Sequence, residues 1–512
     1  MVDFNFSIPL IFFCIFLPLL FILTKSKSAI QTSSKSNPSK LPKSYPIIGS
    51  FFAIVKNEYR FAQWTSEIVN STPNLTFTLH RTFGGASIIT ANAANVHHIL
   101  KSNFHNYEKG DFIKTNLRDF LGDGIFNSDG DKWRSQRHIS SHEFNTKSLR
   151  KFVETAVETE LSGRLLPFLT AAAADKTVVD FQDILQRFAF DNVCKISFGY
   201  DPQYLSPSLN KEKFAAAFEK SVLLSCERFA SFVPYFWKIK KALNIGLEKE
   251  LKIAVSEVRG FAKEIIREKK KRISSSASME SVDEDDLLSR FLSSGHSDEE
   301  LITDIVISFI LAGRDTTSAA LTWFFWLLSN NPEVEAEILR EINEKSELAA
   351  TASAYEEAKD MVYTHASLCE SMRLYPPVAV DTKEAMNDDV LPDGTVVKKG
   401  VRVSYHPYAM GRVERVWGED WAEFRPSRWL ERAASGGEKW RFVTRDSFTY
   451  PVFQAGPRIC LGKEMAFLQM KRVVGGVLRR FRVVPVVAES VYVTDLTAKM
   501  KGGFPVRIEE RN

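Results

Sequence analysis

The 512-residue chain has few cysteines, little net charge and no nucleotide-binding glycine motif. Its five cysteines show no paired spacing, which argues against a disulfide scaffold or a zinc ribbon and favours a reducing compartment. A net charge of +4 on this length argues against a nucleic-acid partner. Because Gly-x-Gly-x-x-Gly is missing, the chain carries no flavin or nicotinamide fingerprint. An oxidoreductase built on it would receive its electrons from another protein.

An uncharged, apolar segment lies near the N-terminus. Phe4–Thr24 would span roughly 30 Å as a helix, the thickness of a bilayer core. Lysines follow from Lys25 onward, so the positive-inside rule places the body in the cytosol. A cleaved secretory signal is the alternative, disfavoured because no positive side chain precedes the long apolar run. We expect a membrane anchor at residues 1–25, a linker with a proline-rich hinge at 26–50, and one body at 51–512.

Beyond residue 40 the chain is predicted to be mainly α-helical, with small β-sheets. Apolar residues recur at helical spacing in three long segments, Val153–Leu169, Lys213–Ser225 and Leu247–Lys271. Strand signals are shorter, and occur as a hairpin pattern at Thr76–Thr90 and as runs at Val401–Val403 and Phe481–Val487. With 44% hydrophobic residues the body can form a large core.

Cys460 lies in the glycine-containing stretch Phe453–Gly462, and strong helix formers follow from Lys463 to Lys471. We therefore expect a turn before a helix N-terminus, where free N–H groups and the helix dipole favour negative charge. Together with Arg458, this position predicts a lowered thiol pKa and a thiolate. A thiolate held in a loop is what an axial cysteine on haem iron requires. A buried structural cysteine explains the local pattern equally well.

The pattern Phe-x-x-Gly-x-Arg-x-Cys-x-Gly resembles the haem-binding signature of the cytochrome P450 family. All five fixed positions are present, as Phe453, Gly456, Arg458, Cys460 and Gly462. The resemblance implies the cytochrome P450 fold behind an N-terminal transmembrane helix, with haem b as cofactor. It implies that Cys460 binds the haem iron, that Phe453 shields the sulfur and that Arg458 pairs with a haem propionate.

Leu301–Asn330 is predicted to be a long apolar helix with the polar stretch Ala312–Thr317 at its centre. Threonine and glycine weaken a helix locally, which predicts a local opening; a kink with satisfied polar groups is the alternative. The stretch resembles the oxygen-activation motif of the same family. That implies a hydrogen-bond network around dioxygen held by Thr316, and proton relay by Asp315. Three apolar residues are expected to face substrate, Ile310, Leu311 and Ala312.

Two further motifs resemble the family's haem-propionate contacts. Trp133 and Arg137 stand four residues apart, so they share a helix face; a surface cation–π pair is the simpler explanation. By resemblance both contact a haem propionate. Lys383 follows a Pro-Pro segment at a place where relatives have a basic propionate partner, and it is the candidate here.

A structural network is also implied by resemblance. Glu370 and Arg373 are three residues apart, within pairing distance on a helix. In the family such a pair joins a later arginine, which matches Arg428, in a buried network that holds the fold. Ser427 stands where the family usually has an acid, a departure that spares the arginine.

A thiolate-bound haem and a Thr/Asp pair together imply a monooxygenase that inserts one oxygen atom of O₂ into a C–H bond. The expected electron source is NADPH-cytochrome P450 reductase in the endoplasmic reticulum membrane, with the catalytic body facing the cytosol. Lys463, Lys471 and Arg472 flank the cysteine loop and are expected to meet an acidic face of this reductase.

Several stretches resemble plant enzymes of subfamily ninety-four, which includes fatty-acid ω-hydroxylases. They are Ser141–Arg150, Ala312–Ala320, Asp388–Gly394, Tyr408–Arg412 and Pro451–Gly456. The resemblance implies hydroxylation of the terminal carbon of fatty acids or fatty-acid-derived molecules. Alternatives are a jasmonoyl–isoleucine hydroxylase and then a sterol side-chain hydroxylase. Two alternatives come from other functional classes. One is a hydroperoxide-rearranging haem isomerase, which is disfavoured because Thr316 is present. The other is a membrane-anchored binding protein without turnover.

Overall fold

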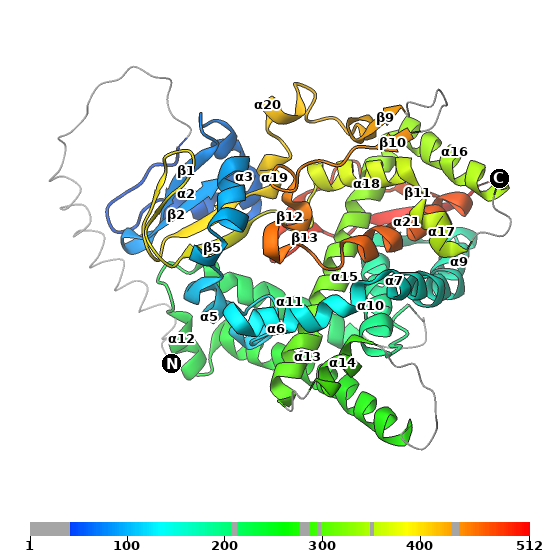
Figure 1. Cartoon of the computed structure of the whole chain (residues 1–512), viewed down its shortest axis with the longest axis horizontal. Helices are drawn as coiled ribbons and strands as arrows, with labels where there is room; N and C mark the ends of the chain where they lie inside the picture. Colours follow the sequence, from blue (N-terminus) through cyan, green and yellow to red (C-terminus); the bar gives the residue numbers. More distant parts are fainter. Residues whose placement is uncertain are drawn as a thin grey trace, which may run out of the picture.

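The computed structural model describes residues 41–205, 212–276, 286–294, 298–348, 353–432 and 440–511. Helices form most of this part of the chain, and the largest sheet lies at one end of the molecule (Figure 1). The predicted class, mainly α with small β-sheets, is therefore confirmed. The predicted anchor at Phe4–Thr24 lies outside the described residues. Among the residues that are described, no helix is both long and apolar enough to cross a membrane.

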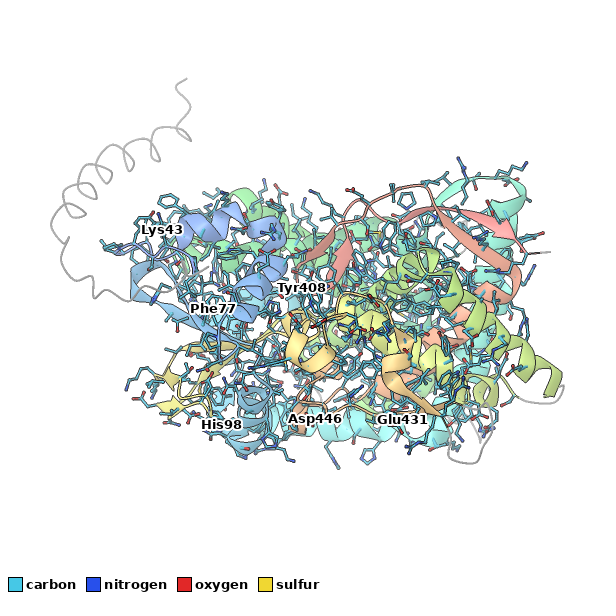
Figure 2. All side chains as sticks on the ribbon, turned by 90° about the horizontal axis from the view of Figure 1, so that it is seen from above. Lys43, Phe77, His98, Tyr408, Glu431 and Asp446 are labelled. Atoms are coloured by element: carbon cyan, nitrogen blue, oxygen red, sulfur yellow. The ribbon has the colours of Figure 1, made fainter. Side chains whose placement is uncertain are left out.

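The largest sheet has five strands in the order β1-β2-β8-β5-β3. These strands are β1 (Thr76–His80), β2 (Ala86–Thr90), β3 (Tyr107–Glu108), β5 (Asp381–Ala385) and β8 (Arg402–Tyr405). β2 and β8 are parallel, and the other neighbours are antiparallel. β1 and β2 form the hairpin predicted at Thr76–Thr90. Figure 2 shows Phe77 of β1 and Lys43 toward the same end of the molecule, away from Glu431.

The other sheets are small. One has the order β11-β14-β4, with β11 (Phe481–Pro485), β14 (Pro505–Glu510) and β4 (Val178–Asp180). Three are strand pairs, β6 (Asp389–Val390) with β7 (Val396–Val397), β9 (Leu430–Arg432) with β10 (Trp440–Phe442), and β12 (Tyr492–Thr494) with β13 (Ala498–Met500). The strands predicted near Val401–Val403 and Phe481–Val487 are β8 and β11.

Longer α-helices form the body of the molecule. In chain order they are α3 (Phe61–Asn70), α5 (Gly110–Leu121), α6 (Gly130–Ser141), α9 (Leu166–Ala174), α10 (Phe181–Phe198), α11 (Glu212–Ala230), α13 (Gly246–Ser276), α15 (Glu299–Ser329), α16 (Pro332–Leu348), α18 (Val362–Leu374) and α21 (Lys463–Arg480). Shorter ones are α2 (Phe51–Lys56), α4 (Ala93–His97), α7 (Thr146–Lys151), α8 (Glu158–Glu160), α12 (Trp237–Ala242), α14 (Leu287–Ser293), α17 (Ala354–Lys359), α19 (Pro407–Met410) and α20 (Glu414–Trp417).

Helix α15 runs through the centre of the body (Figure 1) and packs along α10, α13, α18 and α21. It begins where the Asp298 side chain accepts hydrogen bonds from the backbone N–H groups of Glu300 and Leu301. It ends at Ser329, just before Pro332 opens the next helix. Most of its side chains are buried on every side, as expected of a helix inside a large core.

The predicted helix at Val153–Leu169 is less regular than its apolar spacing suggests. Two stretches, Phe152–Val157 and Leu161–Leu165, have the wider turns of a π-helix, with α-helical turns between and after them. The widened turns still place Phe152, Val157 and Leu161 in the core. Periodicity of apolar residues therefore predicts the buried face here but not the hydrogen-bond pattern.

Candidate functional site

One cavity brings together the cysteine loop, α15 and β5. The loop contributes Val452, Phe453, Gln454, Arg458, Ile459, Cys460, Leu461 and Gly462, and α15 contributes Ser308, Phe309, Ala312, Gly313, Thr316, Thr317 and Ala320. Phe126, Met372 and Val378 add apolar wall. Four cationic side chains also line it, Lys109, Arg137, Lys383 and Arg458. A thiol, a threonine hydroxyl, several cations and apolar surface thus line the same cavity.

The loop that carries Cys460 is fixed by its backbone. The N–H of Cys460 donates to the carbonyl oxygen of Phe453 over 2.9 Å. Gly456 has φ +63°, and a Cβ there would lie 2.0 Å from the carbonyl oxygen of Leu100. Gly462 is the N-cap of α21, so the predicted position of Cys460 before a helix N-terminus is confirmed. Gly462 itself has φ −85°, and the structure gives no steric reason for glycine at that position.

Replacing Gly456 by alanine should destabilise the protein. The new Cβ would meet the Leu100 carbonyl oxygen in a left-handed backbone conformation, so we expect a loss of more than ~1 kcal/mol in the free energy of unfolding. Urea titration of each variant would measure it. The matched control is Gly260→Ala in α13, where a Cβ meets no atom within 4 Å and alanine should be neutral or stabilising. Equal midpoints for the two variants would contradict the steric argument.

The thiol of Cys460 does not have the lowered pKa that its sequence context predicts. Its accessible surface opens into the cavity, and the surrounding protein desolvates it, so burial raises the pKa of Cys460. The backbone N–H of Gly462 and the charges of Arg137 and Lys463 act in the opposite direction but more weakly. Arg458, the cation expected to help, instead donates to Asp129. A cation bound directly to the sulfur would favour the thiolate.

Trp133, Arg137 and Arg458 lie together at one end of the cavity. The Arg458 Cζ stands 4.4 Å and the Arg137 Cζ 5.8 Å from the Trp133 ring centroid. Arg137 Nη2 donates to the Ile459 carbonyl oxygen over 2.8 Å, which ties α6 to the cysteine loop. Arg458 Nη2 donates to Asp129 Oδ1 over 2.7 Å. The three predicted residues are thus in contact, and two guanidiniums border the cavity.

Lys383 reaches the same cavity from β5, where it pairs with a carboxylate that the sequence did not single out. Its Nζ lies 2.9 Å from Asp381 Oδ2, and Lys109 Nζ lies 3.1 Å from Asp381 Oδ1. Burial lowers the pKa of Lys383 to about 7, although the charge of Asp381 opposes this. Two lysines around one carboxylate leave a net positive charge at this wall. Asp381 and Lys109 belong to no short motif, so only the fold reveals their role beside Lys383.

On α15 the predicted polar pair divides between two faces. Thr316 lines the cavity, and its Oγ1 donates to the Ala312 carbonyl oxygen over 2.6 Å. Asp315 is buried away from the cavity lining and pairs with Arg314 over 2.8 Å. Burial raises the pKa of Asp315, against the charge of Arg314. The helix continues without interruption through this stretch, so the predicted local opening is absent. The threonine hydroxyl bond to the preceding turn satisfies the polar group instead.

Of the three apolar residues expected to face substrate, one lines the cavity. Ala312 lines the cavity. Ile310 and Leu311 pack into the core that α15 shares with α11 and α13. Helical geometry explains the difference, because residues one and two positions apart point to different sides of the helix.

The residues predicted as a structural network lie in one buried cluster outside the cavity. Arg373 donates to both Glu370 oxygens over 2.8 Å, and Arg428 Nε donates to Glu370 Oε1 over 3.1 Å. Trp429 Nε1 donates to Glu370 Oε2 over 2.9 Å. Asp420 contacts Arg428 over 2.8 Å and supplies an acid near Ser427, where the sequence departs from the usual pattern. Trp429 and Asp420 are the members that motif matching missed.

Comparison with known proteins agrees with these features. The family described as Cytochrome P450 matches residues 40–499. Cytochrome P450 94A2 of Vicia sativa is 60% identical over 497 residues, 96% of each chain. Cytochrome P450 94A1 of the same plant is 58% identical, covering 93% of this chain and 92% of the relative. Cytochrome P450 94B1 of Arabidopsis thaliana is 50% identical, covering 95% of this chain and 94% of the relative.

The cofactor of this family is haem bound through a thiolate, and the cavity suits it. Haem presents two carboxylates, a flat apolar macrocycle and an iron that accepts sulfur. The cavity offers four cations against the Asp381 carboxylate, apolar walls and the Cys460 thiol. Three findings lead to one conclusion. They are the family match across most of the chain, the high sequence identity to the relatives, and the groups that line the cavity. The chain belongs to the cytochrome P450 family, within subfamily ninety-four, and is a haem-thiolate monooxygenase.

Proposed function

We propose that the enzyme hydroxylates the terminal (ω) carbon of fatty acids or fatty-acid-derived molecules. The observation that carries this proposal is that Cys460 and Thr316 line one cavity with apolar walls, including Phe126, Phe309 and Val378. An unreactive C–H bond at the end of an apolar chain suits such a space. Identity of 60% to a relative in subfamily ninety-four supports the same substrate class, through the resemblance described above.

In this proposal the haem, when bound, supplies the oxidising chemistry, and a cysteine thiolate ligand favours O–O cleavage. Cys460 binds the iron, and Phe453 packs beside it in the same loop. Arg137, Lys383 and Arg458 neutralise the propionates, with Trp133 positioning the two guanidiniums. The network of Glu370, Arg373 and Arg428 holds the fold around the site without touching it.

Thr316 and Asp315 are the proposed proton-handling residues. The Thr316 hydroxyl donates to the Ala312 carbonyl oxygen, so its own lone pairs remain available to accept a hydrogen bond from water. Asp315 is one residue away but turned to Arg314, so any relay through its carboxyl needs a side-chain rotation or an intervening water.

A Thr316→Ala variant should still bind substrate, but most of the NADPH that it consumes should no longer yield hydroxylated product. We expect NADPH consumption within about twofold of wild type but hydroxylated product reduced about a hundredfold to ten-thousandfold, the range of a lost proton-transfer group. Product formed per NADPH consumed is the measurement. Thr317→Ala, a neighbouring cavity-lining threonine, is the matched control. A Thr316→Ala enzyme with wild-type coupling would remove this residue from the proposal.

The family implies a reductase as electron donor, and we propose NADPH-cytochrome P450 reductase. Two of the three cationic side chains expected to contact the reductase instead bind partners within the protein. Lys471 is buried and donates to the Lys359 carbonyl oxygen, and Arg472 pairs with Glu357 and Glu158. Lys463, at the start of α21, remains as a candidate contact. Lys471 and Arg472 differ from the expectation because they lie on the face of α21 that packs against the core.

We also propose attachment to the endoplasmic reticulum membrane with the body in the cytosol. The described chain begins beside an exposed apolar surface that would support it. Phe51 of α2 lies 4.7 Å from Phe232, centroid to centroid, so the start of the body adjoins the segment around α12. Exposed apolar side chains on the two segments are Leu41, Ile47, Phe52, Val55, Tyr59, Phe236, Ile239, Leu243, Ile245 and Leu247. Lysines of α12 lie between them, a pattern suited to lipid headgroups.

The test is turnover in microsomes with a plant reductase and NADPH. A medium-chain fatty acid and jasmonoyl–isoleucine are offered in competition, and the products are identified by mass spectrometry. We expect ω-hydroxy fatty acid as the main product. A hydroxylated conjugate as the main product would favour hormone catabolism instead. No product from either, with a normal thiolate-type carbon monoxide spectrum, would refute the substrate class and leave the haem assignment intact.

A further inference from the structure

Two arginines meet on one face of the five-stranded sheet. Arg402 of β8 lies opposite Ser87 of β2, and Leu79 of β1 lies opposite the same Ser87. Paired residues point to the same face of a sheet, as do residues two apart in one strand. Arg81 follows Leu79 by two residues with extended backbone, φ −100° and ψ 172°. The register therefore brings the Arg81 and Arg402 side chains to one face.

Aromatic side chains from other elements cover these arginines. The Arg402 Cζ lies 3.9 Å from the ring centroid of Phe112, in the first turn of α5. The Phe112 ring lies 6.0 Å from that of Tyr235, between α11 and α12. Thr82, next to the first arginine, donates to the Phe232 carbonyl oxygen over 2.9 Å. The sheet, α5 and the segment before α12 therefore converge at this place.

No carboxylate among the described residues forms an ion pair with either guanidinium. Within the residues that the structure describes, neither side chain forms a hydrogen bond or an ion pair, and Arg81 Nε is buried without a partner. The pKa of Arg81 is lowered to about 10, by burial first and by the charge of Arg402 second. Burial also lowers the pKa of Arg402. Both side chains keep part of their surface exposed, but two neighbouring cations of like charge repel each other unless an anion joins them.

Two acidic groups lie in this region, Glu384 and Asp111. Glu384 of β5 lies opposite Arg402 in the sheet and acts on it electrostatically, but no ion pair joins them among the described residues. Burial raises the pKa of Glu384, and the backbone N–H of Phe112 acts in the opposite direction. Asp111 lies near Glu384 and raises its pKa. The Tyr235 hydroxyl is the remaining titratable group that acts on Arg402. An external anion is therefore the partner that would complete the pair.

We propose that Arg81 and Arg402 bind the carboxylate of the substrate. This inference rests on the proposed function and deepens it: the substrate is an amphiphile with an anionic head and an apolar chain, which excludes an uncharged sterol. Guanidinium groups match carboxylates in both charge and shape. Lys109, which lines the central cavity, directly precedes α5, and Phe112 covers Arg402 about one turn later. The apolar chain would thus follow α5 from the arginines into the cavity.

The proposal is tested by comparing a fatty acid with its neutral ester. Holoprotein is titrated with dodecanoic acid and with methyl dodecanoate, and the ligand-induced change in haem absorbance gives a Kd for each. The wild type should bind the acid more tightly than the ester. Arg81→Gln and Arg402→Gln should each weaken acid binding about tenfold or more, and leave the Kd of the ester within about twofold. Arg482→Gln, on an exposed position of β11, is the matched control and should change neither value.

An unchanged acid-to-ester preference in the double variant, or no preference in the wild type, would overturn the proposal. Should the Gln variants fail to fold, Arg81→Lys and Arg402→Lys decide, because retained charge predicts a retained preference and its loss overturns the proposal. Product analysis separates this from the proposed function. Hydroxylation away from the chain end, with an arginine-dependent acid preference, would refute ω-hydroxylation alone. ω-Hydroxylation with the same acid-to-ester preference in the wild type and the double variant would refute the carboxylate site alone.

Discussion

A Cys460→Ser variant should lose the carbon monoxide absorbance band of thiolate-bound haem, and its turnover should fall more than about a hundredfold. A serine hydroxyl does not ionise in place of the thiol, so it cannot donate the same electron density to iron. The loop should nevertheless survive the change. Its geometry depends on the Cys460 N–H bond to Phe453 and on the close approach of Gly456 to Leu100, not on the sulfur. The reduced carbon monoxide spectrum and product formation are the two measurements.

Cys226→Ser is the matched control, because Cys226 lies on α11 and does not line the central cavity. It should keep both the band and the activity. A Cys460→Ser protein that retains the thiolate band would show that another cysteine binds the iron. Among the described cysteines Cys369 would then be tested next, although its thiol is fully buried against the core.

A Glu370→Gln variant should unfold far more easily than the wild type. The Glu370 carboxylate accepts hydrogen bonds from Arg373, Arg428 and Trp429, and both Glu370 and Arg373 are completely buried. Removing its charge leaves the Arg373 guanidinium without compensation in the interior, which costs about 3–5 kcal/mol. We expect a clear fall in the urea midpoint of unfolding and little recoverable holoprotein.

The control for this experiment is a carboxylate on the surface. Glu337 pairs with Arg340 over 2.9 Å at an exposed position of α16, where an ion pair contributes about 0–1 kcal/mol. Glu337→Gln should therefore leave the midpoint almost unchanged. If Glu370→Gln were as mild as Glu337→Gln, the cluster would not be holding the fold.

Several features of the fold and the site could be predicted from local sequence patterns. The helix through Ala312–Thr317, the β1–β2 hairpin and the turn before α21 all follow from apolar spacing and glycine placement. The contacts among Glu370, Arg373 and Arg428 were also anticipated, because two of them lie one turn apart on α18. Such signals depend on residues close in sequence, where geometry is nearly fixed by the element itself.

Sequence-based predictions failed, or were not made, for features that depend on tertiary packing. The pKa of Cys460 depends on how much protein desolvates the thiol, which no local pattern reports, so the expected shift had the wrong direction. Lys471 and Arg472 were expected to meet the reductase, but α21 buries them and both have partners within the protein. Asp381 meets Lys109 and Lys383 only after three distant segments assemble. Ion pairs between distant segments can be identified only once the fold is known.

The parallel pairing of β2 with β8 also sets an order of events in biosynthesis. Ser87 leaves the ribosome long before Arg402, its partner across the strands. The early β1–β2 hairpin therefore has an unpaired strand edge until most of the chain has been made, and such edges invite aggregation. Gly456 closes against Leu100 later still. We expect nascent chains truncated before residue 402 to need chaperones, and the cofactor to bind only after synthesis is nearly complete.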